Sequence, residues 1–437
     1  MHIVLLSGGS GKRLWPLSND IRSKQFIPIF PQLDGTHISM VQRVFRQIRQ
    51  ADPTADVTIA TSKSQVSTLR NQLGDAVDIS VEPCRRDTFP AIVLVSAYLH
   101  YVKGVGLDKA VAVCPVDPYV EGRYFTAVHR LTELAAAGTA NLMLMGIEPT
   151  YPSEKYGYIM PASKNEVSSV RSFKEKPDAA TAQEYIAQGA LWNSGVFAYR
   201  LGYVLATAHR LLDFQGYEDL YAHYGELEKI SFDYAVVERE QSIGVLRYAG
   251  EWKDLGTWNT LTEIMQEHTI GQAVLDDTCR DVHVINEMDV PVLCMGLKQA
   301  VVAASPEGIL VADKGASSYI KPYVEQFDQQ IHFAEKSWGR FQIIDVEDDS
   351  LTIKITLNAG HAMNYHRHAH RAEVWTIVRG QGEVIVDGAR REVQAGDIIE
   401  LPCGCAHTLR AVTQLVAIEV QLGPDIQRED KIKEDLP

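Results

Sequence analysis

Apolar residues recur with two different periods along the first half of the chain. From His2 to about Arg200, short aliphatic and β-branched runs alternate with stretches that carry apolar residues at helical spacing. The runs predicted as buried parallel strands are His2–Leu6, Val57–Ala60, Ile79–Val81, Ala110–Val113 and Leu142–Met145. The stretches predicted as helices are Val41–Gln50, Ala91–Val102 and Phe125–Ala137. This alternation predicts βαβ units in a three-layer α/β domain around a mixed, mostly parallel sheet.

The helical pattern fades after Gln272. Between Gln272 and Tyr319 short apolar runs follow Gly or polar turns, which predicts a strand-rich connector. Beyond Trp338 apolar runs recur about every 8–12 residues between Gly turns, as in an all-β sandwich or barrel. The strands predicted there are Phe341–Val346, Leu351–Leu357, Val374–Val378, Glu383–Val386, Glu392–Val393, Asp397–Leu401 and Val412–Val420. The predicted domains are therefore 1–265, a connector over 266–330, a β domain over 331–425 and a charged tail, 426–437, expected to be frayed.

The composition narrows the class of protein. With 46% hydrophobic and 22% charged residues, the chain has the proportions of a water-soluble globular protein. Its formal net charge of −14 argues against nucleic acid or an anionic membrane as the main partner. No apolar run reaches the roughly 18 residues that span a bilayer, and the N-terminal apolar stretch is too short for a signal peptide. The 6 cysteines follow no disulfide spacing, so a cytoplasmic enzyme is expected.

A Gly-rich segment, Ser7–Arg13, follows the first predicted strand. Such a turn at the carboxyl end of a parallel strand directs backbone N–H groups at an anion. Its spacing fits neither a Walker P-loop, because Leu6 occupies the first glycine position, nor the dinucleotide fingerprint, because Leu14 occupies the third. Four cations follow the glycines closely: Lys12, Arg13, Arg22 and Lys24. Phosphate binding is therefore favoured over a purely structural turn.

The sequence GGSGKRLWPLS followed by Lys24-Gln25-Phe26 is very similar to the signature of the sugar-1-phosphate nucleotidylyltransferases, GGxGTRLxPLT…PK. The residues around Trp15 and Gln25 resemble those of the mannose-1-phosphate guanylyltransferase branch. Further blocks that resemble the family in its own order are EPCRRDTFPAI (82–92), CPVD (114–117), YGYI (156–159), FKEKP (173–177), WNSG (192–195), FDYA (232–235) and WKDLGTW (252–258). The resemblance covers residues 2 to about 315. It implies a Rossmann-like domain that transfers a nucleotidyl group from GTP, or another nucleoside triphosphate, to a sugar 1-phosphate with release of pyrophosphate.

The chemistry of that transfer explains the residue types. A phosphate oxygen attacks the α-phosphorus of a second polyanion, so catalysis depends on positioning and charge neutralisation. The resemblance assigns catalytic roles to Arg13, Lys24 and Asp117, and a Mg²⁺ ion to Asp117 and Asp254, in line with the preference of Mg²⁺ for carboxylate and phosphate oxygens. The nucleotide-binding residues that it implies are Gly8, Gly9, Gly11, Lys12, Glu82 and Arg86. The sugar-phosphate-binding residues that it implies are Tyr158, Glu175, Lys176, Asn193 and Gly195.

Four positions depart from the family pattern. Lys12 stands where threonine is usual, Asp87 replaces asparagine, Pro118 replaces histidine and Lys174 replaces an apolar residue. The changes at Asp87 and Pro118 fall near the expected base and ribose positions. The same reaction with another base or sugar therefore stays an alternative to GDP-mannose synthesis.

The β-rich end contains two cupin motifs with the required spacing. Residues 360–380 match G-x5-H-x-H-x4-E-x6-G, and residues 396–407 match G-x5-P-x-G-x2-H. On a strand His366 and His368 point to one face, where Glu373 and His407 can join them. Three imidazoles and a carboxylate suit Zn²⁺ or another divalent transition metal such as Mn, Fe or Ni.

This end also resembles the type II phosphomannose isomerase domain that is fused to many guanylyltransferases. Three positions of its metal block differ: His366 replaces glutamine, and Ala369 and Val374 replace histidines. Because the last two changes remove ionisable groups, we expect metal binding with little isomerase activity. The alternatives are a bifunctional enzyme that also interconverts mannose 6-phosphate and fructose 6-phosphate, and a non-catalytic sugar-nucleotide sensor. The intact transferase residues count against the sensor, and a homodimer is a candidate assembly.

Overall fold

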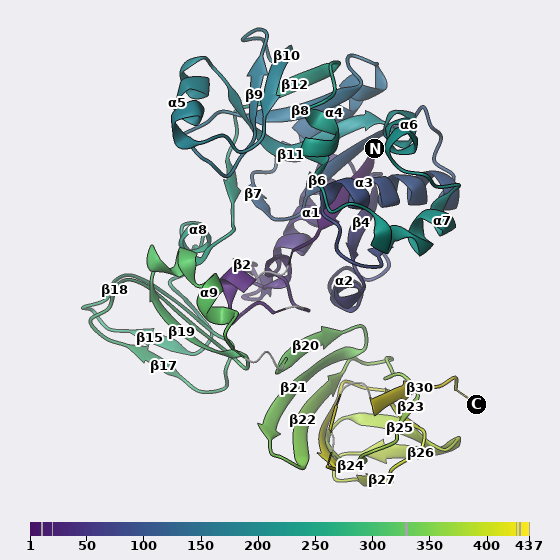
Figure 1. Cartoon of the computed structure of the whole chain (residues 1–437). Coiled ribbons are helices and arrows are strands. Elements are labelled where there is room, and N and C mark those ends of the chain that lie inside the picture. The colour runs from purple at the N-terminus through teal and green to yellow at the C-terminus, as the bar shows by residue number, and fades with distance from the viewer. Residues whose placement is uncertain (10–11, 20, 328–330, 425, 428–429, 437) are drawn as a thin grey trace. The chain divides into compact units, whose positions relative to one another are not determined.

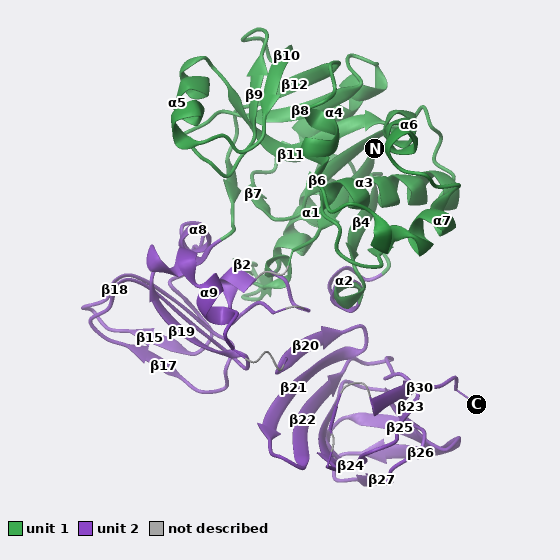
Figure 2. Cartoon of the chain, in the orientation of Figure 1, with its two compact units in different colours: residues 1–9, 24–66, 75–256 green, residues 10–23, 67–74, 257–437 purple. Residues whose placement is uncertain are grey.

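The computed structural model describes residues 1–9, 12–19, 21–327, 331–424, 426–427 and 430–436 (Figure 1). The chain forms two compact units (Figure 2). Unit 1 comprises residues 1–9, 24–66 and 75–256, and unit 2 comprises residues 10–23, 67–74 and 257–437. Among the helices of the described ranges, none has both the length and the apolar character needed to cross a bilayer.

Unit 1 is built on one mixed sheet with the strand order β5-β4-β1-β6-β11-β8-β12-β10-β9. Its strands are β1 (His2–Ser7), β4 (Asp56–Ser62), β5 (Asp78–Glu82), β6 (Ala110–Pro115), β8 (Leu142–Ile147), β9 (Tyr158–Pro161), β10 (Val167–Lys174), β11 (Leu191–Arg200) and β12 (Ile243–Tyr248). Pairing is parallel from β5 to β6 and between β8 and β12, and antiparallel elsewhere. The carboxyl ends of β1 and β6 therefore lie side by side, where α/β folds bind ligands.

Unit 1 also contains helices, and three of them overlap the stretches that the apolar spacing predicts as helical. The helices are α1 (Met40–Ala51), α3 (Thr88–Ala97, continued by a π-helical segment, Tyr98–Val102), α4 (Tyr124–Ala136), α5 (Ala179–Ala187), α6 (Leu201–Leu211) and α7 (Tyr217–Ala222). Helix α3 is buried on all sides and joins residues of β6, β8 and α6 in one apolar core. A helix that is apolar all round is a core helix, so α3 fixes the α/β architecture around the sheet.

Unit 2 begins with the strand-rich connector. It contains α8 (Trp258–Thr262), β14 (Thr269–Ile270), β15 (Ala273–Leu275), β16 (Arg280–Asn286), β17 (Val292–Cys294), β18 (Lys298–Ser305), β19 (Gly308–Asp313) and α9 (Lys321–Val324). The segment that follows the Gly-rich turn packs on it: Ser305 Oγ donates to the carbonyl oxygen of Pro16 at 2.7 Å, and Trp258 Nε1 donates to that of Trp15 at 3.1 Å.

The C-terminal part of unit 2 consists of two facing sheets around an apolar core that includes Leu357, Trp375 and Leu409. One sheet has the order β20-β21-β22-β29-β24-β27 and the other β26-β25-β28-β23-β30. Their strands are β20 (Phe333–Lys336), β21 (Gly339–Val346), β22 (Ser350–Leu357), β23 (His366–His368), β24 (Ala372–Arg379), β25 (Gln381–Val386), β26 (Ala389–Gln394), β27 (Ile398–Leu401), β28 (His407–Ala411), β29 (Leu415–Leu422) and β30 (Lys431–Lys433).

The described residues 430–436 of the charged tail include a paired strand, contrary to the fraying expected from their composition. β30 pairs antiparallel with β23, so that His368 lies opposite Lys431 and His366 opposite Lys433. The carboxylate of Asp430 accepts the backbone N–H groups of Ala369 and His370. The segment has little apolar surface to bury. These hydrogen bonds order it instead, because they pair the backbone groups along the open edge of β23.

Candidate functional site

Lys24 and two aspartates meet at the carboxyl edge of the unit 1 sheet. Asp117 lies between β6 and β7 (Pro118–Val120), and the pairing of β7 with β13 (Trp252–Asp254) places Asp254 opposite Pro118. Lys24 Nζ lies 2.7 Å from Asp117 Oδ2, 3.6 Å from Asp254 Oδ1 and 3.3 Å from the carbonyl oxygen of Leu255. The structure thus brings three predicted residues together as a lysine–aspartate centre (Lys24, Asp117 and Asp254).

This centre has two carboxylates for one ammonium group. Burial would lower the pKa of Lys24, but Asp117 and Asp254 outweigh burial and raise that pKa, so Lys24 stays charged. Burial would raise the pKa of Asp117, but Lys24 holds that pKa below its usual range. The aspartate side chains are 37% and 40% exposed. Two reachable carboxylates with a net negative charge fit a Mg²⁺ ion in charge and in ligand type.

A polar network holds the end of β1 that leads into the Gly-rich turn. Gln25 Nε2 donates to Ser7 Oγ at 2.9 Å and to Gln65 Oε1 at 3.4 Å. Gln65 Nε2 donates to the carbonyl oxygen of Gly9 at 3.4 Å. Gly9 has a φ of 100°, which favours glycine, and both it and Gly8 are exposed. Gln25 and Gln65 thus support the turn, although the sequence motif assigned neither residue a role.

Three of the four cations after the Gly-rich turn, Lys12, Arg13 and Arg22, belong to unit 2, whereas Lys24 belongs to unit 1. Arg13 is exposed and Lys12 is half-buried, whereas Gly11 lies outside the described residues. Arg22 forms a bidentate ion pair with Glu287, with nitrogen–oxygen distances of 2.7 and 2.8 Å. The sequence grouped Arg22 with the cations that favour phosphate binding, but in this conformation a carboxylate that directly follows the connector strand β16 occupies its guanidinium.

Replacing Arg22 with methionine is expected to lower the free energy of unfolding by about 2 kcal/mol. The substitution leaves the Glu287 carboxylate, which is 24% exposed, without its bidentate partner. The urea midpoint of unfolding measures the effect. A second substitution, Glu287→Leu, should restore much of the loss; an unchanged midpoint in the single variant would show that the pair contributes little.

The predicted nucleotide-binding residues Glu82 and Arg86 both contact the segment Tyr224–Gly225. The Tyr224 hydroxyl donates to Glu82 Oε2 at 2.9 Å, and Arg86 Nη2 donates to the carbonyl oxygen of Gly225. Burial raises the pKa of Glu82, partly offset by the Tyr224 hydroxyl. Each of the two residues is thus tied to the same short helical segment.

The residues predicted to bind the sugar phosphate gather at a bulge in β11. The register of β11 shifts after Asn193, and Gly195 has a φ of 73°. Glu175 is buried, and its Oε1 lies 2.7 Å from Lys176 Nζ. Asp233, which the sequence motif contained without an assigned role, accepts a hydrogen bond from Asn193. We call Glu175, Lys176, Asn193 and Asp233 the bulge cluster.

Tyr158 pairs with Trp192 of β11, and its side chain is buried. It is 1% exposed, and its hydroxyl donates to the carbonyl oxygen of Ser153 at 3.0 Å and accepts from the backbone N–H of Ser153 at 2.9 Å. The hydroxyl therefore fixes the segment before β9. The sequence predicts that Tyr158 binds the sugar, but in this conformation its side chain has almost no exposed surface for a direct contact.

Aromatic rings connect the bulge cluster to the lysine–aspartate centre. The ring of Trp192, next to Asn193, lies 4.9 Å from that of Tyr156 and 6.5 Å from that of Trp252. Trp252 lies two residues before Asp254 on β13. These tryptophans pack against other aromatic rings of the unit, and they connect the two groups of polar residues.

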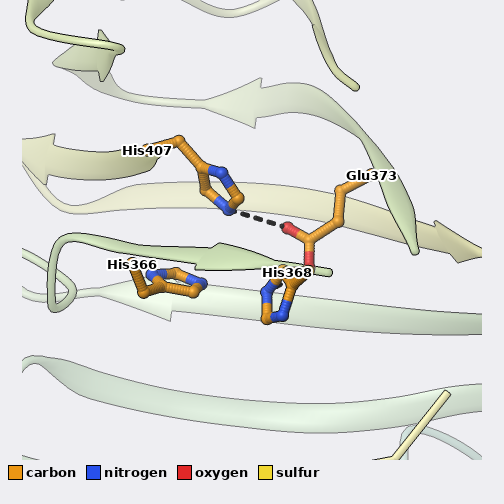
Figure 3. A group of neighbouring side chains, drawn as sticks. All are labelled: His366, His368, Glu373 and His407. Carbon is orange, nitrogen blue, oxygen red and sulfur yellow. Dashed lines mark ion pairs between the residues drawn. The ribbon is translucent and has the colours of Figure 1, made fainter. Parts of the chain in front are cut away.

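In unit 2 the four cupin residues converge (Figure 3). His366 and His368 come from β23, Glu373 from β24 and His407 from β28. Each is 2% exposed, and their ligand atoms all lie within 4.8 Å of one another. Glu373 Oε1 lies 3.0 Å from His368 Nε2, and its Oε2 lies 3.3 Å from His407 Nε2. This cupin centre (His366, His368, Glu373 and His407) has the donor set of a divalent transition-metal site.

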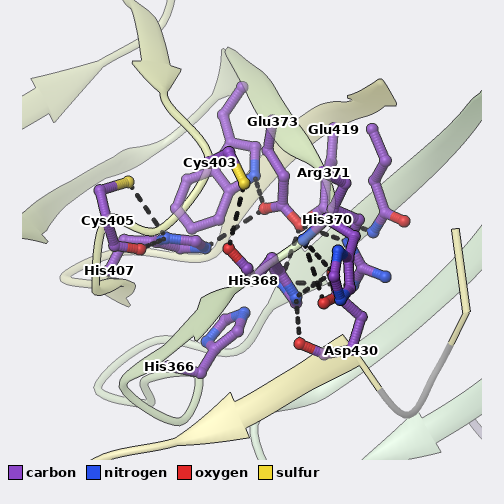
Figure 4. A network of polar contacts seen from close by, with 12 residues as sticks. His366, His368, His370, Arg371, Glu373, Cys403, Cys405, His407, Glu419 and Asp430 are labelled. Carbon is purple, nitrogen blue, oxygen red and sulfur yellow. Dashed lines mark hydrogen bonds and ion pairs between the residues drawn. The ribbon is translucent and has the colours of Figure 1, made fainter. Parts of the chain in front are cut away.

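Hydrogen bonds orient the imidazoles of the cupin centre, and Figure 4 shows the polar contacts around His368 and His407. Nδ1 of His366 lies 2.7 Å from the carbonyl oxygen of Asn364, and Nδ1 of His407 lies 3.0 Å from that of Cys405. These contacts direct Nε2 toward the centre, as outer hydrogen bonds do in metal sites. Burial, aided by a nearby lysine and by His407, lowers the pKa of His366 to about 3, so this imidazole is in the neutral form that binds metals.

Other ionisable groups lie next to the cupin centre, in the interior between the two facing sheets, which we call the cupin chamber. Arg371 Nε donates to Glu373 Oε1 at 3.4 Å. Glu419 is 6% exposed on β29 and accepts a hydrogen bond from Gln421 Nε2. Burial, and then the Glu373 carboxylate, raises the pKa of Glu419 to about 8. The chamber therefore contains a second carboxyl group besides the one predicted from the motif.

The two substitutions that suggested weak isomerase activity lie outside this chamber. Val374 falls between Glu373 and Trp375, whose side chains are buried inside, so the alternation of β24 points Val374 to the opposite face. Ala369 is exposed. Their replacement of histidine therefore removes no group from the chamber, and the argument for weak activity does not hold.

Comparisons with known proteins match a family in each of the two regions that contain these sites. Residues 2–270 match the nucleotidyl transferase family, and residues 325–435 match the C-terminal domain of mannose-6-phosphate isomerase. The chain is 29% identical over 479 residues to a mannose-1-phosphate guanylyltransferase of Escherichia coli (strain K12), covering 99% of this chain and 97% of the relative. It is also 29% identical to the xanthan biosynthesis protein XanB of Xanthomonas campestris pv. campestris (strain B100), over 98% of this chain and 97% of the relative.

A solved structure shares the fold. The crystal structure described as mannose-1-phosphate geranyltransferase from Thermus thermophilus superimposes with a TM-score of 0.61 and 28% identity, covering 74% of this chain and 98% of that one. These findings confirm the predicted fold: a mixed α/β nucleotidyltransferase domain, a strand-rich connector and a cupin domain. Because the family match extends over more than half of the chain, this protein is an enzyme that belongs to the nucleotidyl transferase family.

Proposed function

We propose that this enzyme transfers the guanylyl group of GTP to mannose 1-phosphate and releases pyrophosphate, forming GDP-mannose. The observation that carries the proposal is the lysine–aspartate centre, in which Lys24 Nζ lies 2.7 Å from Asp117 and 3.6 Å from Asp254. The full-length relatives named mannose-1-phosphate guanylyltransferase support the choice of base and sugar. We place this reaction in residues 1–265.

The roles of the residues follow from the charges. A phosphate oxygen of the sugar 1-phosphate attacks the α-phosphorus of GTP, the bond to the β-phosphate breaks, and pyrophosphate leaves. Lys24 neutralises charge that develops on the α-phosphate and the leaving group, and Arg13 binds the triphosphate through its planar guanidinium. Asp117 and Asp254 would hold a Mg²⁺ ion, which would supply further charge neutralisation on the phosphates. Gly8 and Gly9 offer backbone N–H groups.

The test is pyrophosphate release from four nucleoside triphosphates against a panel of sugar 1-phosphates. Turnover should be fastest with GTP and mannose 1-phosphate and should require a divalent cation. A faster reaction with another base would show that the enzyme has a different base specificity, and would connect that specificity with the changes at Asp87 and Pro118. No release with any pair would refute the transferase.

The cupin chamber favours a second candidate function, the interconversion of mannose 6-phosphate and fructose 6-phosphate in residues 331–425. The cupin centre fits a Zn²⁺ ion or another transition metal that would polarise a carbonyl, and Glu419 lies in the same chamber for proton transfer. A coupled assay with added Zn²⁺, Co²⁺ or Mn²⁺ is expected to detect isomerisation that His368→Ala abolishes and Lys24→Ala leaves intact. Equal background rates in wild type and His368→Ala would refute this second function.

A further inference from the structure

Two hydrogen bonds hold the side-chain amide of Asn193 in one orientation. Its Nδ2 donates to Asp233 Oδ1 at 2.7 Å, and its Oδ1 accepts the backbone N–H of Gly195 at 3.2 Å. Since one partner is an acceptor and the other a donor, turning the amide over would set oxygen against oxygen and N–H against N–H. The fixed amide keeps one further N–H and one further lone pair, each on a defined side.

This amide lies close to the proposed site of transfer. A Cβ built on Gly195 would lie 3.7 Å from the side chain of Pro115, the last residue of β6, two residues before Asp117. Asn193 is 8% exposed, and Ser194 Oγ anchors the same bulge by donating to the carbonyl oxygen of Met145 at 2.9 Å. The bulge is thus a rigid platform beside the end of β6.

Asp233 lies on an unusual helical element. It begins a π-helical turn, Asp233–Val237, a geometry that is frequent at functional sites. The backbone N–H of Phe232, the preceding residue, donates to Thr88 Oγ1 at 2.8 Å and ties the turn to the start of α3. The backbone that carries Asp233 is therefore tied to α3 through the residue next to it.

The surroundings of Asp233 shift its pKa. Burial, and then the Glu175 carboxylate, raises the pKa of Asp233 to about 7, whereas Lys176 and Asn193 act in the opposite sense. Lys176 Nζ lies 2.7 Å from Glu175 Oε1 and also interacts electrostatically with Tyr234. The bulge cluster thus has two carboxyl groups for one ammonium group.

We propose that Asp233 is a positioning residue for the sugar 1-phosphate: it fixes the Asn193 amide so that its remaining N–H and lone pair receive a hydroxyl of the sugar. This inference rests on the proposed transferase function. Because Asp233 acts through Asn193 and not on the phosphates, its loss should weaken binding of the sugar phosphate and leave the KM for GTP unchanged.

The experiment compares Asp233→Ala and Asp233→Asn with wild type in steady-state kinetics, with Glu184→Gln on the exposed face of α5 as the matched control. Asp233→Ala should raise the KM for mannose 1-phosphate about tenfold or more, with a small change in kcat, because a hydrogen bond to a charged group is lost. Asp233→Asn keeps an acceptor and should stay within about threefold of wild type. The KM for mannose 1-phosphate of Asp233→Asn, divided by that of wild type, should change with pH around neutrality, because Asp233 can ionise in wild type and the amide in the variant cannot. The ionisation of the substrate phosphate affects both proteins equally and cancels in this ratio.

Three results would overturn the inference: an unchanged KM for mannose 1-phosphate in Asp233→Ala, equal increases in the KM values for both substrates, or a KM ratio for Asp233→Asn that is constant with pH. If Asp233→Ala does not fold, the pH dependence of Asp233→Asn still decides. If wild type and Glu184→Gln both fail to release pyrophosphate, the proposed function fails instead, and that outcome is distinct from the three above.

Discussion

Replacing Lys24 with alanine is expected to slow nucleotidyl transfer by roughly a hundredfold or more, because one electrostatic contact to the transition state is worth about 3 kcal/mol. Lys24 is the cation that the structure places between Asp117 and Asp254, with its pKa raised by both carboxylates, so it carries full charge at neutral pH. Pyrophosphate release at saturating GTP, mannose 1-phosphate and Mg²⁺ measures the loss. The KM values should change less than kcat.

The controls for this prediction distinguish the loss of charge at the centre from a general effect of losing a lysine. Lys164→Ala removes an exposed lysine of the same unit and should leave turnover unchanged. Asp254→Asn should abolish the Mg²⁺-dependent activity, because it removes one of two carboxylates at the centre. Near-normal turnover in both Lys24→Ala and Asp254→Asn at saturating Mg²⁺ would refute the assignment of the centre.

The cupin centre should lose its metal when a single ligand is removed. Purified wild-type protein is expected to contain about one equivalent of a divalent transition metal, and His368→Ala or Glu373→Gln should contain almost none, because the four ligand atoms form one closely packed donor set. Elemental analysis of the purified proteins gives the measurement. Guanylyl transfer should persist in both variants, since Lys24, Asp117 and Asp254 are untouched.

His361→Ala is the control for metal loss, because His361 is an exposed histidine of the same domain with Nδ1 near the carbonyl oxygen of Ala359. Its metal content should equal that of wild type. Metal-free wild-type protein after growth with added Zn²⁺, Mn²⁺ and Co²⁺, or equal metal contents in wild type and His368→Ala, would contradict the prediction.

The sequence was sufficient for features that depend on local order. Alternating apolar runs predicted β1, β4, β5, β6 and β8, because a strand in a buried parallel sheet must be apolar on both faces. Motif spacing predicted the cupin centre, because a period of two puts His366 and His368 on one face of a strand. The sequence also predicted Lys24, Asp117 and Asp254 by resemblance to a family, although it offered no reason for their contact.

Other features depended on contacts between segments that are far apart in the sequence, and the local pattern of apolar residues does not indicate such contacts. Arg22 has the local setting of a phosphate-binding cation, but Glu287 pairs with it from 265 residues away. The segment Lys431–Lys433 lacks an apolar pattern and is ordered by the open edge of β23. Asp233 acquired a role only when folding brought it within 2.7 Å of Asn193.

The chamber of the cupin domain shows the same dependence on tertiary structure. The replacement of histidine at Val374 and Ala369 suggested a loss of activity, but β24 directs Val374 to its outer face, and Glu419 enters the chamber from β29. The sequence could not relate β24 to β29, because the two strands are more than 30 residues apart and pair only in the folded sheet. In each case the free energy of a polar group depends on the partner that replaces water, and only the tertiary structure determines that partner.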